Sequence, residues 1–141
     1  MLTIKIKYAP GVKPIRQAHP GEWFDLRSSM QVAYDPGSIV IAPLGVAMEL
    51  PPGYEAIIRP RSSMTRKCGL VFADSGVIDN SFRGDNDWWG STWYAVRSGV
   101  IRKNQRIAQF RIQRIQERAD FEVVEELGNQ DRGGYGSTGE E

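Results

Sequence analysis

The chain has 141 residues, with 18 lysines and arginines against 17 aspartates and glutamates, and a formal net charge of +1. This length suits one domain with a sizeable core, while the balanced charge gives no support to nucleic-acid binding by bulk electrostatics. Because Cys68 and His19 are the only residues of their kinds, one chain can form neither a disulfide framework nor a zinc site of cysteine and histidine.

Residues 2–8 (LTIKIKY) alternate between apolar and polar side chains, as a half-buried strand does. Their lysines and their alternation distinguish them from a signal peptide. No stretch of the chain approaches 18 consecutive apolar residues, so no membrane-spanning segment is predicted. We therefore expect a cytoplasmic protein with no membrane partner and no direct contact with nucleic acid.

Further strands are predicted where β-branched and apolar stretches lie between glycine and proline turns. Residues 38–50 read as two short strands joined at a bend, and the others are predicted within 51–61, 91–99, 104–115 and 121–127. In the 104–115 strand, Ala108, Phe110 and Ile112 are predicted to face one side, while Ile107, Gln109, Arg111 and Gln113 face the other. One helical turn is predicted at residues 62–67 (SSMTRK), where Ser62 or Ser63 could cap the exposed amides.

Many short strands with turn signals between them predict an all-β fold, a sandwich or barrel of jelly-roll type. The composition changes only after Leu127, to glycine and polar residues. We therefore predict a single β domain over residues 1–127. Residues 128–141 are predicted to form a flexible, glycine-rich C-terminal arm, which something outside the arm must order.

The stretch RPRSSMTRK, residues 59–67, combines four cations with two adjacent hydroxyl groups at a strand-to-turn junction. Serine hydroxyls and the free amides at a helix start are suitable phosphate ligands. The alternative is a helix cap surrounded by solvated arginines. Further along, Gln109 offers an amide beside the basic Arg106, although a glutamine on the polar face of a strand commonly contacts solvent.

Two aspartates are candidate functional carboxylates. Asp79, in SGVIDNSFRGD, either closes an Asx-turn or orients water as a general base at the mouth of a pocket that Phe82 could wall. Asp25, in EWFDLRSS, is either a strand-end aspartate or a holder of Mg²⁺ through water, since this ion keeps several waters and takes other ligands from phosphates.

The tail DRGGYGSTG, residues 131–139, lacks the order GxxxxGK[ST] and a following helix, which excludes a P-loop. Its glycines free backbone amides, and Arg132, Ser137 and Thr138 add donors that suit a triphosphate.

Taken in order, FDL, PRSS, GVIDNSFRG, RIAQ and RGGYGSTG resemble the five motifs of the trimeric dUTP pyrophosphatases (dUTPases), from Trp23 to Gly139. PLGVAMELPPGYEA and GDNDWW resemble in particular the dUTPases of Bacillus-type bacteria and their phages. Three positions depart from the family pattern. Trp23 and Phe24 stand where small residues are usual, Ser63 replaces a glycine, and Phe82 replaces a tyrosine.

The RSSxxR form of the second motif also resembles the related dCTP deaminases, which share the fold. Deamination is therefore the alternative activity. The deaminases lack the RGGYGSTG motif and depend on a glutamate where this chain has Gly84. A third hypothesis, from another class, is a phage regulatory binding protein, for which the sequence specifies no partner.

The resemblance implies a Mg²⁺-assisted hydrolysis of dUTP to dUMP and pyrophosphate, which keeps uracil out of DNA and supplies dUMP for dTMP synthesis. It assigns Asp79 as the base and Asp25 as the holder of the metal through water. Phe82 lies under the deoxyribose. The phosphates are bound by Arg61, Ser62, Ser63 and Gln109. Main-chain groups of the hairpin before Asp79, including Ser75, Gly76, Val77 and Ile78, read the uracil.

The resemblance also implies a homotrimer with shared active sites, in which the last motif crosses to a neighbouring subunit and closes over the nucleotide. Arg132 then pairs with the γ-phosphate, Tyr135 covers the uracil ring, and Gly136, Ser137 and Thr138 supply donors. In the Bacillus-type relatives an aromatic near DNDWW can be the lid, so Trp88, Trp89 and Trp93 compete with Tyr135 for that role.

Overall fold

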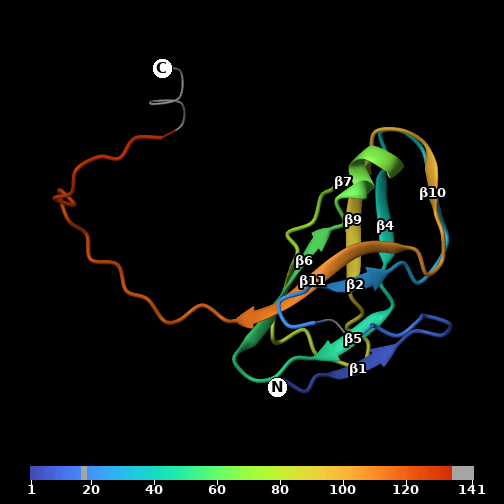
Figure 1. Cartoon of the computed structure of the whole chain (residues 1–141), viewed down its shortest axis with the longest axis horizontal. Coiled ribbons are helices and arrows are strands. Elements are labelled where there is room, and N and C mark those ends of the chain that lie inside the picture. The colour runs from blue at the N-terminus through green and yellow to red at the C-terminus, as the bar shows by residue number, and fades with distance from the viewer. Residues whose placement is uncertain (17–18, 135–141) are drawn as a thin grey trace.

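The computed structural model describes residues 1–16 and 19–134, and its ordered elements are strands with a single helical turn (Figure 1). The strands are β1 (Lys5–Tyr8), β2 (Phe24–Arg27), β3 (Val32–Tyr34), β4 (Ile39–Pro43), β5 (Val46–Glu49), β6 (Tyr54–Pro60), β7 (Leu70–Phe72), β8 (Val77–Ile78), β9 (Gly90–Ala95), β10 (Gly99–Ile101) and β11 (Arg106–Arg114). The turn η1 (Met64–Cys68) follows β6.

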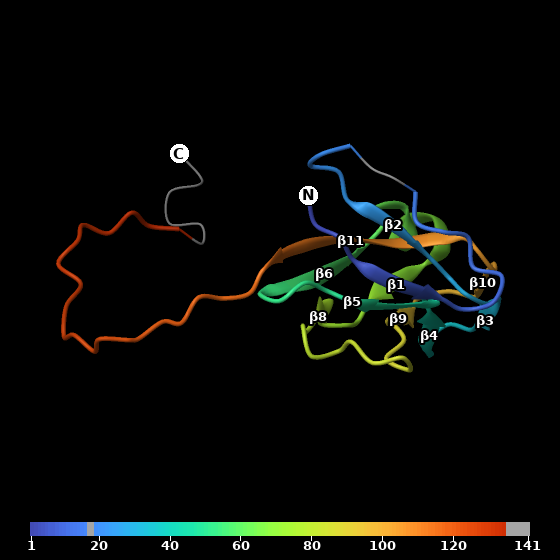
Figure 2. The ribbon, with the colours of Figure 1, turned by 90° about the horizontal axis from the view of Figure 1, so that it is seen from below.

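The strands form antiparallel sheets that enclose one core. A four-stranded sheet has the order β2-β11-β6-β8, and a three-stranded sheet has the order β4-β9-β7, with the smaller pairs β1-β5 and β10-β3 beside them. Figure 2 shows the β2-β11-β6 layer on one side and β4 and β9 on the other. Trp89 packs edge-on against Phe110 of the first layer, and Phe72 packs against Trp93 in the second. The predicted all-β fold is confirmed.

Several predicted elements are confirmed in detail. Residues 38–50 do form two strands, β4 and β5, joined at a bend where Gly45 has φ of 66°. The predicted helical turn is present as η1, and Ser63 precedes it, but its hydroxyl makes no capping bond. Strands β2, β3, β7, β8 and β10 were not predicted as such, because two to four residues are too few to show a period.

The predicted outward direction of Ile107 is wrong. The pairing of β11 with β2 shifts in register between Arg106 and Ala108, as in a β-bulge, and both Ile107 and Ala108 are completely buried. A bulge breaks the simple alternation of faces, so two consecutive residues of this strand enter the core.

The predicted last strand at 121–127 is also wrong. Strand β11 ends at Arg114, and the following segment leaves the β-domain as an extended chain (Figures 1 and 2). Phe121 is 88% exposed and Val123 is 95% exposed. A strand needs a neighbour for its backbone groups, and within the described chain these residues have none. The boundary at residue 127 stays a prediction.

No helix among residues 1–16 and 19–134 is long and apolar enough to cross a membrane.

Two neighbouring residues on β10 allow a test of the core. Ile101 is fully buried, while Val100 is 48% exposed. We expect Ile101→Ala to lower the free energy of unfolding by about 2–5 kcal/mol, because it removes buried methyl groups and leaves a cavity. Val100→Ala should lower the free energy of unfolding by less than about 1 kcal/mol. Denaturant unfolding at a fixed protein concentration measures both, and equal losses would contradict the assignment of the two faces.

Candidate active site

The outer face of the four-stranded sheet carries three polar side chains in register. Gln109 on β11 pairs with Asp25 on β2 and with Arg59 on β6. Directly opposed residues point to the same face of a sheet, so strand pairing alone brings together residues that are far apart in the sequence. The amide of Gln109 also donates to the carbonyl of Pro60 at 3.3 Å, which holds this side chain toward the end of β6.

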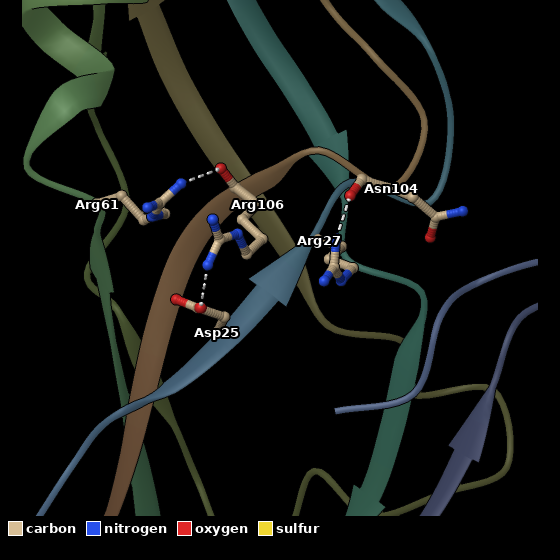
Figure 3. Close-up of polar contacts among 5 residues, drawn as sticks. All are labelled: Asp25, Arg27, Arg61, Asn104 and Arg106. Carbon is tan, nitrogen blue, oxygen red and sulfur yellow. Dashed lines mark hydrogen bonds and ion pairs between the residues drawn. The ribbon is translucent and has the colours of Figure 1, made fainter. Parts of the chain in front are cut away.

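Arginines surround the carboxylate of Asp25 (Figure 3). Nη1 of Arg106 lies 3.2 Å from Oδ2 of Asp25, in an ion pair that is partly exposed on both sides. Arg61 donates to the carbonyl of Arg106 at 3.4 Å, and Arg27 donates to the carbonyl of Asn104 at 2.7 Å. A chain of contacts therefore links Asp25 to Arg61, the first residue after β6.

Ser62 and Ser63 follow Arg61 directly and lead into η1. The backbone N–H of Arg61 donates to the carbonyl of Ile107 at 3.1 Å, and its own carbonyl accepts from Met64. These bonds fix the loop against the beginning of β11. The predicted phosphate-binding residues Arg61, Ser62, Ser63 and Gln109 therefore lie near one another, at the same end of the sheet as Asp25.

Residues 73–78 connect the two sheets instead of forming a paired hairpin. Strand β7 pairs with β9, whereas β8 pairs with β6. Gly76 accepts a 2.5 Å hydrogen bond from the N–H of Ile58 and has φ of 77°. A Cβ at Gly76 would collide with the carbonyl oxygen of Ile58, so the close approach of this segment to β6 requires glycine. Ser75 and Val77 remain exposed beside it.

Asp79 forms the Asx-turn that the sequence offered as one alternative. Its Oδ2 accepts hydrogen bonds from the hydroxyl and, at 3.0 Å, from the N–H of Ser81. These bonds lower the pKa of Asp79 below its ordinary value, the hydroxyl bond having the larger effect. The carboxylate is therefore ionised at neutral pH. Phe82, whose N–H bonds to the carbonyl of Asp79, is 38% exposed.

Asn80, which the sequence analysis did not single out, anchors this turn. Its amide donates to the carbonyls of Pro51 and Tyr54 at 2.9 and 2.8 Å. The turn is therefore held at the start of β6, while Ser62 and Ser63 follow its end. Six residue steps along a strand span about 20 Å, so one chain does not bring Asp79 together with the serines.

Of the site residues predicted in the C-terminal arm, the structure describes one, Arg132. Arg132 lies in the exposed, extended segment that runs away from the domain. Tyr135, Gly136, Ser137 and Thr138 lie outside the described residues.

Burial separates the aromatic lid candidates. Trp89 is 1% exposed and Trp93 is completely buried, so both belong to the core and neither can cover a nucleotide. Trp88 is only partly buried, and Nζ of Lys7 lies 5.2 Å from its ring centroid. Trp88 thus remains as the alternative to Tyr135.

Metal binding by protein groups alone is not supported by this face. No cluster of three or more histidine, cysteine, aspartate or glutamate side chains occurs among residues 1–16 and 19–134. Asp25 offers a single carboxylate, with one oxygen engaged by Arg106. This donor set fits an ion that keeps its waters and takes its remaining ligands from substrate phosphates, as Mg²⁺ does.

The sequence analysis missed the cations Lys13, Arg16 and Arg27, which line a cavity next to Asp25. Lys13 and Arg16 lie in an irregular segment before β2, where no local pattern indicates which side chains will meet.

The chain is similar to known proteins over most of its length. A sequence model of the dUTPase family matches residues 14–139. The chain is 47% identical to an SPbeta prophage-derived deoxyuridine 5'-triphosphate nucleotidohydrolase of Bacillus subtilis, covering 98% of this chain and 99% of that protein. It is 36% identical to the deoxyuridine 5'-triphosphate nucleotidohydrolase of Rhodococcus erythropolis, covering 98% and 87% respectively.

Solved structures share the fold at lower identity. The dUTPase of Staphylococcus bacteriophage 80alpha, in a mutant form with dUpNHpp, superimposes with a TM-score of 0.74 at 22% identity, covering 97% of this chain and 98% of that one. The dUTPase of S. aureus phage phi11, in a mutant described as coordinating a structural Mg(II) ion, gives a TM-score of 0.71 at 19% identity, covering 89% and 98%.

Ser81 offers a test of the Asp79 turn. We expect Ser81→Ala to raise the pKa of Asp79 toward its ordinary value of 3.8, because the variant removes the hydroxyl bond. The stabilisation from a lowered carboxyl pKa is present above the ordinary value and is lost as the pH falls through the lowered one. The variant should therefore be less stable than wild type above about pH 4, and the difference should disappear as the pH falls through the lowered pKa.

Carboxyl NMR titration of Asp79 measures this shift directly. Ser75→Ala is the matched control, since no hydrogen bond links its hydroxyl to Asp79 in the described structure. An unchanged titration in Ser81→Ala would contradict the turn.

Proposed function

Because this chain belongs to the dUTPase family of hydrolases, we propose that it hydrolyses dUTP to dUMP and pyrophosphate in the cytoplasm. The reaction keeps uracil out of DNA and supplies dUMP for dTMP synthesis. The observation that carries the proposal is the extent of the family match, residues 14–139, which includes every proposed site residue from Asp25 to Thr138. The gathering of Asp25, Arg61 and Gln109 on one face of the sheet adds geometric support.

Asp79 is the proposed general base. It orients a water for in-line attack on the α-phosphorus and takes up the water's proton. An oxygen–phosphorus bond forms from the water, and the bond to the bridging oxygen of the β-phosphate breaks, so pyrophosphate leaves with both electrons of that bond. A carboxylate with a lowered pKa is a weak base, so it takes up the proton as the new oxygen–phosphorus bond makes the water acidic. Positioned acid–base groups are typically worth about 10²–10⁴-fold.

The phosphate chain is bound by the loop after β6 and its neighbours. Arg61, Ser62 and Ser63 supply a guanidinium and two hydroxyls, and Gln109 supplies an amide from β11. Asp25 would hold Mg²⁺ through water, and the ion when bound supplies positive charge that neutralises the triphosphate. The half-exposed ion pair of Asp25 with Arg106 keeps this carboxylate aligned on the same face.

Nucleoside recognition is assigned to the segment before Asp79 and to Phe82. Main-chain groups of Ser75, Gly76, Val77 and Ile78 read the uracil edge, and the packing of Gly76 on Ile58 gives that segment a fixed backbone. The ring of Phe82, exposed beside the Asp79 turn, stacks under deoxyribose and leaves no room for a 2′-hydroxyl.

The proposed enzyme is a homotrimer with shared active sites. Two observations support this. Asp79 and the two serines lie at opposite ends of β6, so a complete site needs more than one chain. The segment after β11 also exposes apolar side chains, among them Phe121 and Val123, that a neighbouring subunit could cover.

The arm closes the proposed site. Arg132 pairs with the γ-phosphate, Tyr135 covers the base, and Gly136, Ser137 and Thr138 donate to the phosphates. The ordering of the arm by the triphosphate would exclude water from the reaction.

Deamination of dCTP is disfavoured by the environment of Gly84. The N–H of Gly84 donates to Oδ2 of Asp87 at 2.7 Å, and a Cβ at Gly84 would lie 2.8 Å from that oxygen. A side chain at position 84 would displace the Asp87 carboxylate from this bond, and the chain has glycine where the deaminases depend on a glutamate.

A separate assay of dUTP and dCTP tests the proposal. We expect pyrophosphate from dUTP and no ammonia from dCTP. Ammonia release from dCTP, or an absence of pyrophosphate from dUTP, would overturn the assigned reaction.

Asp79→Asn tests the assigned base. The amide keeps the size of the side chain and one acceptor oxygen but cannot take up a proton. We expect kcat to fall by at least about 10²-fold, while the affinity for a non-hydrolysable dUTP analogue changes little. Steady-state kinetics and calorimetry measure the two quantities, and near wild-type turnover would remove Asp79 from this role.

Mixing two inactive variants tests the shared site. Asp79→Asn and the double variant Ser62→Ala/Ser63→Ala are each expected to be nearly inactive alone. After they are unfolded together and reassembled in equal amounts, roughly one quarter of the sites should combine an intact Asp79 with intact serines from another chain. Activity should return only in the mixture. If mixing restores nothing, although native mass spectrometry shows mixed oligomers, the site lies within one chain.

A further inference from the structure

A small cavity lies beside Asp25, between the irregular segment at residues 12–16 and β2. Its volume is about 120 Å³, and its polar lining comes from Lys13, Arg16, Asp25, Arg27 and Arg106. Pockets that hold drug-sized ligands are typically about 300–1,000 Å³. This cavity therefore suits a compact inorganic anion and is too small for a whole nucleotide.

The charge of the lining is strongly unbalanced. Four cations face one carboxylate, a difference of 4 − 1 = +3. Arg106 is paired with Asp25 and neutralises it, whereas Lys13, Arg16 and Arg27 form no ion pair with a carboxylate within residues 1–16 and 19–134. Surface cations are commonly just solvated, but these converge on one concavity, where their fields add.

The rim of the cavity is fixed by hydrogen bonds to Asn104, which adopts a left-handed backbone with φ of 66°. Its side-chain oxygen accepts from the backbone N–H of Lys13 at 2.9 Å, and its side-chain amide donates to Gly11 at 2.9 Å. Its carbonyl accepts from Arg27 at 2.7 Å (Figure 3). The backbone of the segment carrying Lys13 is thereby tied to the turn before β11, and Arg27 is held at the rim before any anion binds.

The cavity adjoins the proposed phosphate-binding loop through Arg106. The side chain of Arg106 lines the cavity, and its carbonyl accepts a hydrogen bond from Arg61. An anion leaving the loop at Arg61 therefore has a cationic path into the cavity.

We propose that this cavity is a binding site for inorganic pyrophosphate, with Lys13, Arg16 and Arg27 as cationic ligands, none of which is assigned to dUTP itself. The assignment of pyrophosphate rests on the proposed function, because that reaction releases this anion at the adjoining loop. Pyrophosphate carries enough negative charge to match the excess of three cations. The site acts in product binding, and it makes pyrophosphate an inhibitor of the enzyme.

Calorimetry of the full chain with inorganic pyrophosphate, without nucleotide, tests the site. We expect Lys13→Gln and Arg16→Gln each to weaken pyrophosphate binding by about tenfold, since each removes a charged donor to a charged partner. Lys13→Arg, which keeps the charge, should largely retain binding. Lys5→Gln is the matched control, because Lys5 is an exposed lysine on β1 that pairs with Glu49 and lies outside the cavity lining.

Binding of dUMP serves as the second readout, and it should be unchanged in all four variants. The site is overturned if wild-type protein does not bind pyrophosphate, if Lys13→Gln and Arg16→Gln bind it as wild type does, or if Lys5→Gln weakens it equally.

The dUTP assay on the same wild-type protein separates the two proposals. If pyrophosphate binding depends on Lys13 but the protein does not hydrolyse dUTP, the proposed function is refuted, while the cavity is still supported as an anion-binding site. If the protein hydrolyses dUTP but its pyrophosphate binding does not depend on Lys13, the proposed binding site in the cavity is refuted and the proposed function stands.

Discussion

The ladder between β6 and β11 is the constraint on which the rest of the structure depends. It pairs seven residues of each strand, from Ala108 opposite Pro60 to Arg114 opposite Tyr54. The inner faces of the two strands supply Ile58 and Phe110 to the core, while the outer face aligns Gln109 with Asp25 and Arg59. The same ladder thus sets both the packing of the barrel and the position of the candidate phosphate-binding residues.

Strand β6, Tyr54–Pro60, also separates two parts of the proposed site. The Asp79 turn is anchored at the carbonyl of Tyr54, and the loop with Ser62 and Ser63 begins after Pro60. One strand keeps these ends apart, so the proposed catalytic set requires groups from another chain. Under the proposed function, activity therefore depends on assembly, and the exposed apolar residues after β11 are in keeping with a chain that contacts its neighbours.

Electrostatics on the outer face follow from the same geometry. Asp25 is the one carboxylate among several arginines, and its pair with Arg106 is partly exposed, so it contributes little stability by itself. The ion pair instead orients the Asp25 carboxylate, a candidate metal-binding group, beside the proposed phosphate-binding loop. The neighbouring cavity extends this positive surface with Lys13, Arg16 and Arg27, which suits an enzyme whose substrate and product are both polyanions.

The sequence by itself determined the all-β class, the bend between β4 and β5, the helical turn after β6 and the resemblance to the dUTPase family. These features depend on local signals, such as alternation, glycine turns and short motifs. Such signals are present in the sequence whichever strands pair in the folded protein. Only the tertiary structure decided that Trp89 and Trp93 are core residues and that Ile107 turns inward at a bulge. It also showed that residues 121–127 have no strand partner among residues 1–16 and 19–134. It also placed Lys13 beside Asp25 and Asp79 far from Ser62. The reason is that burial and proximity depend on which strands pair, and β6 and β11 lie about fifty residues apart in the sequence.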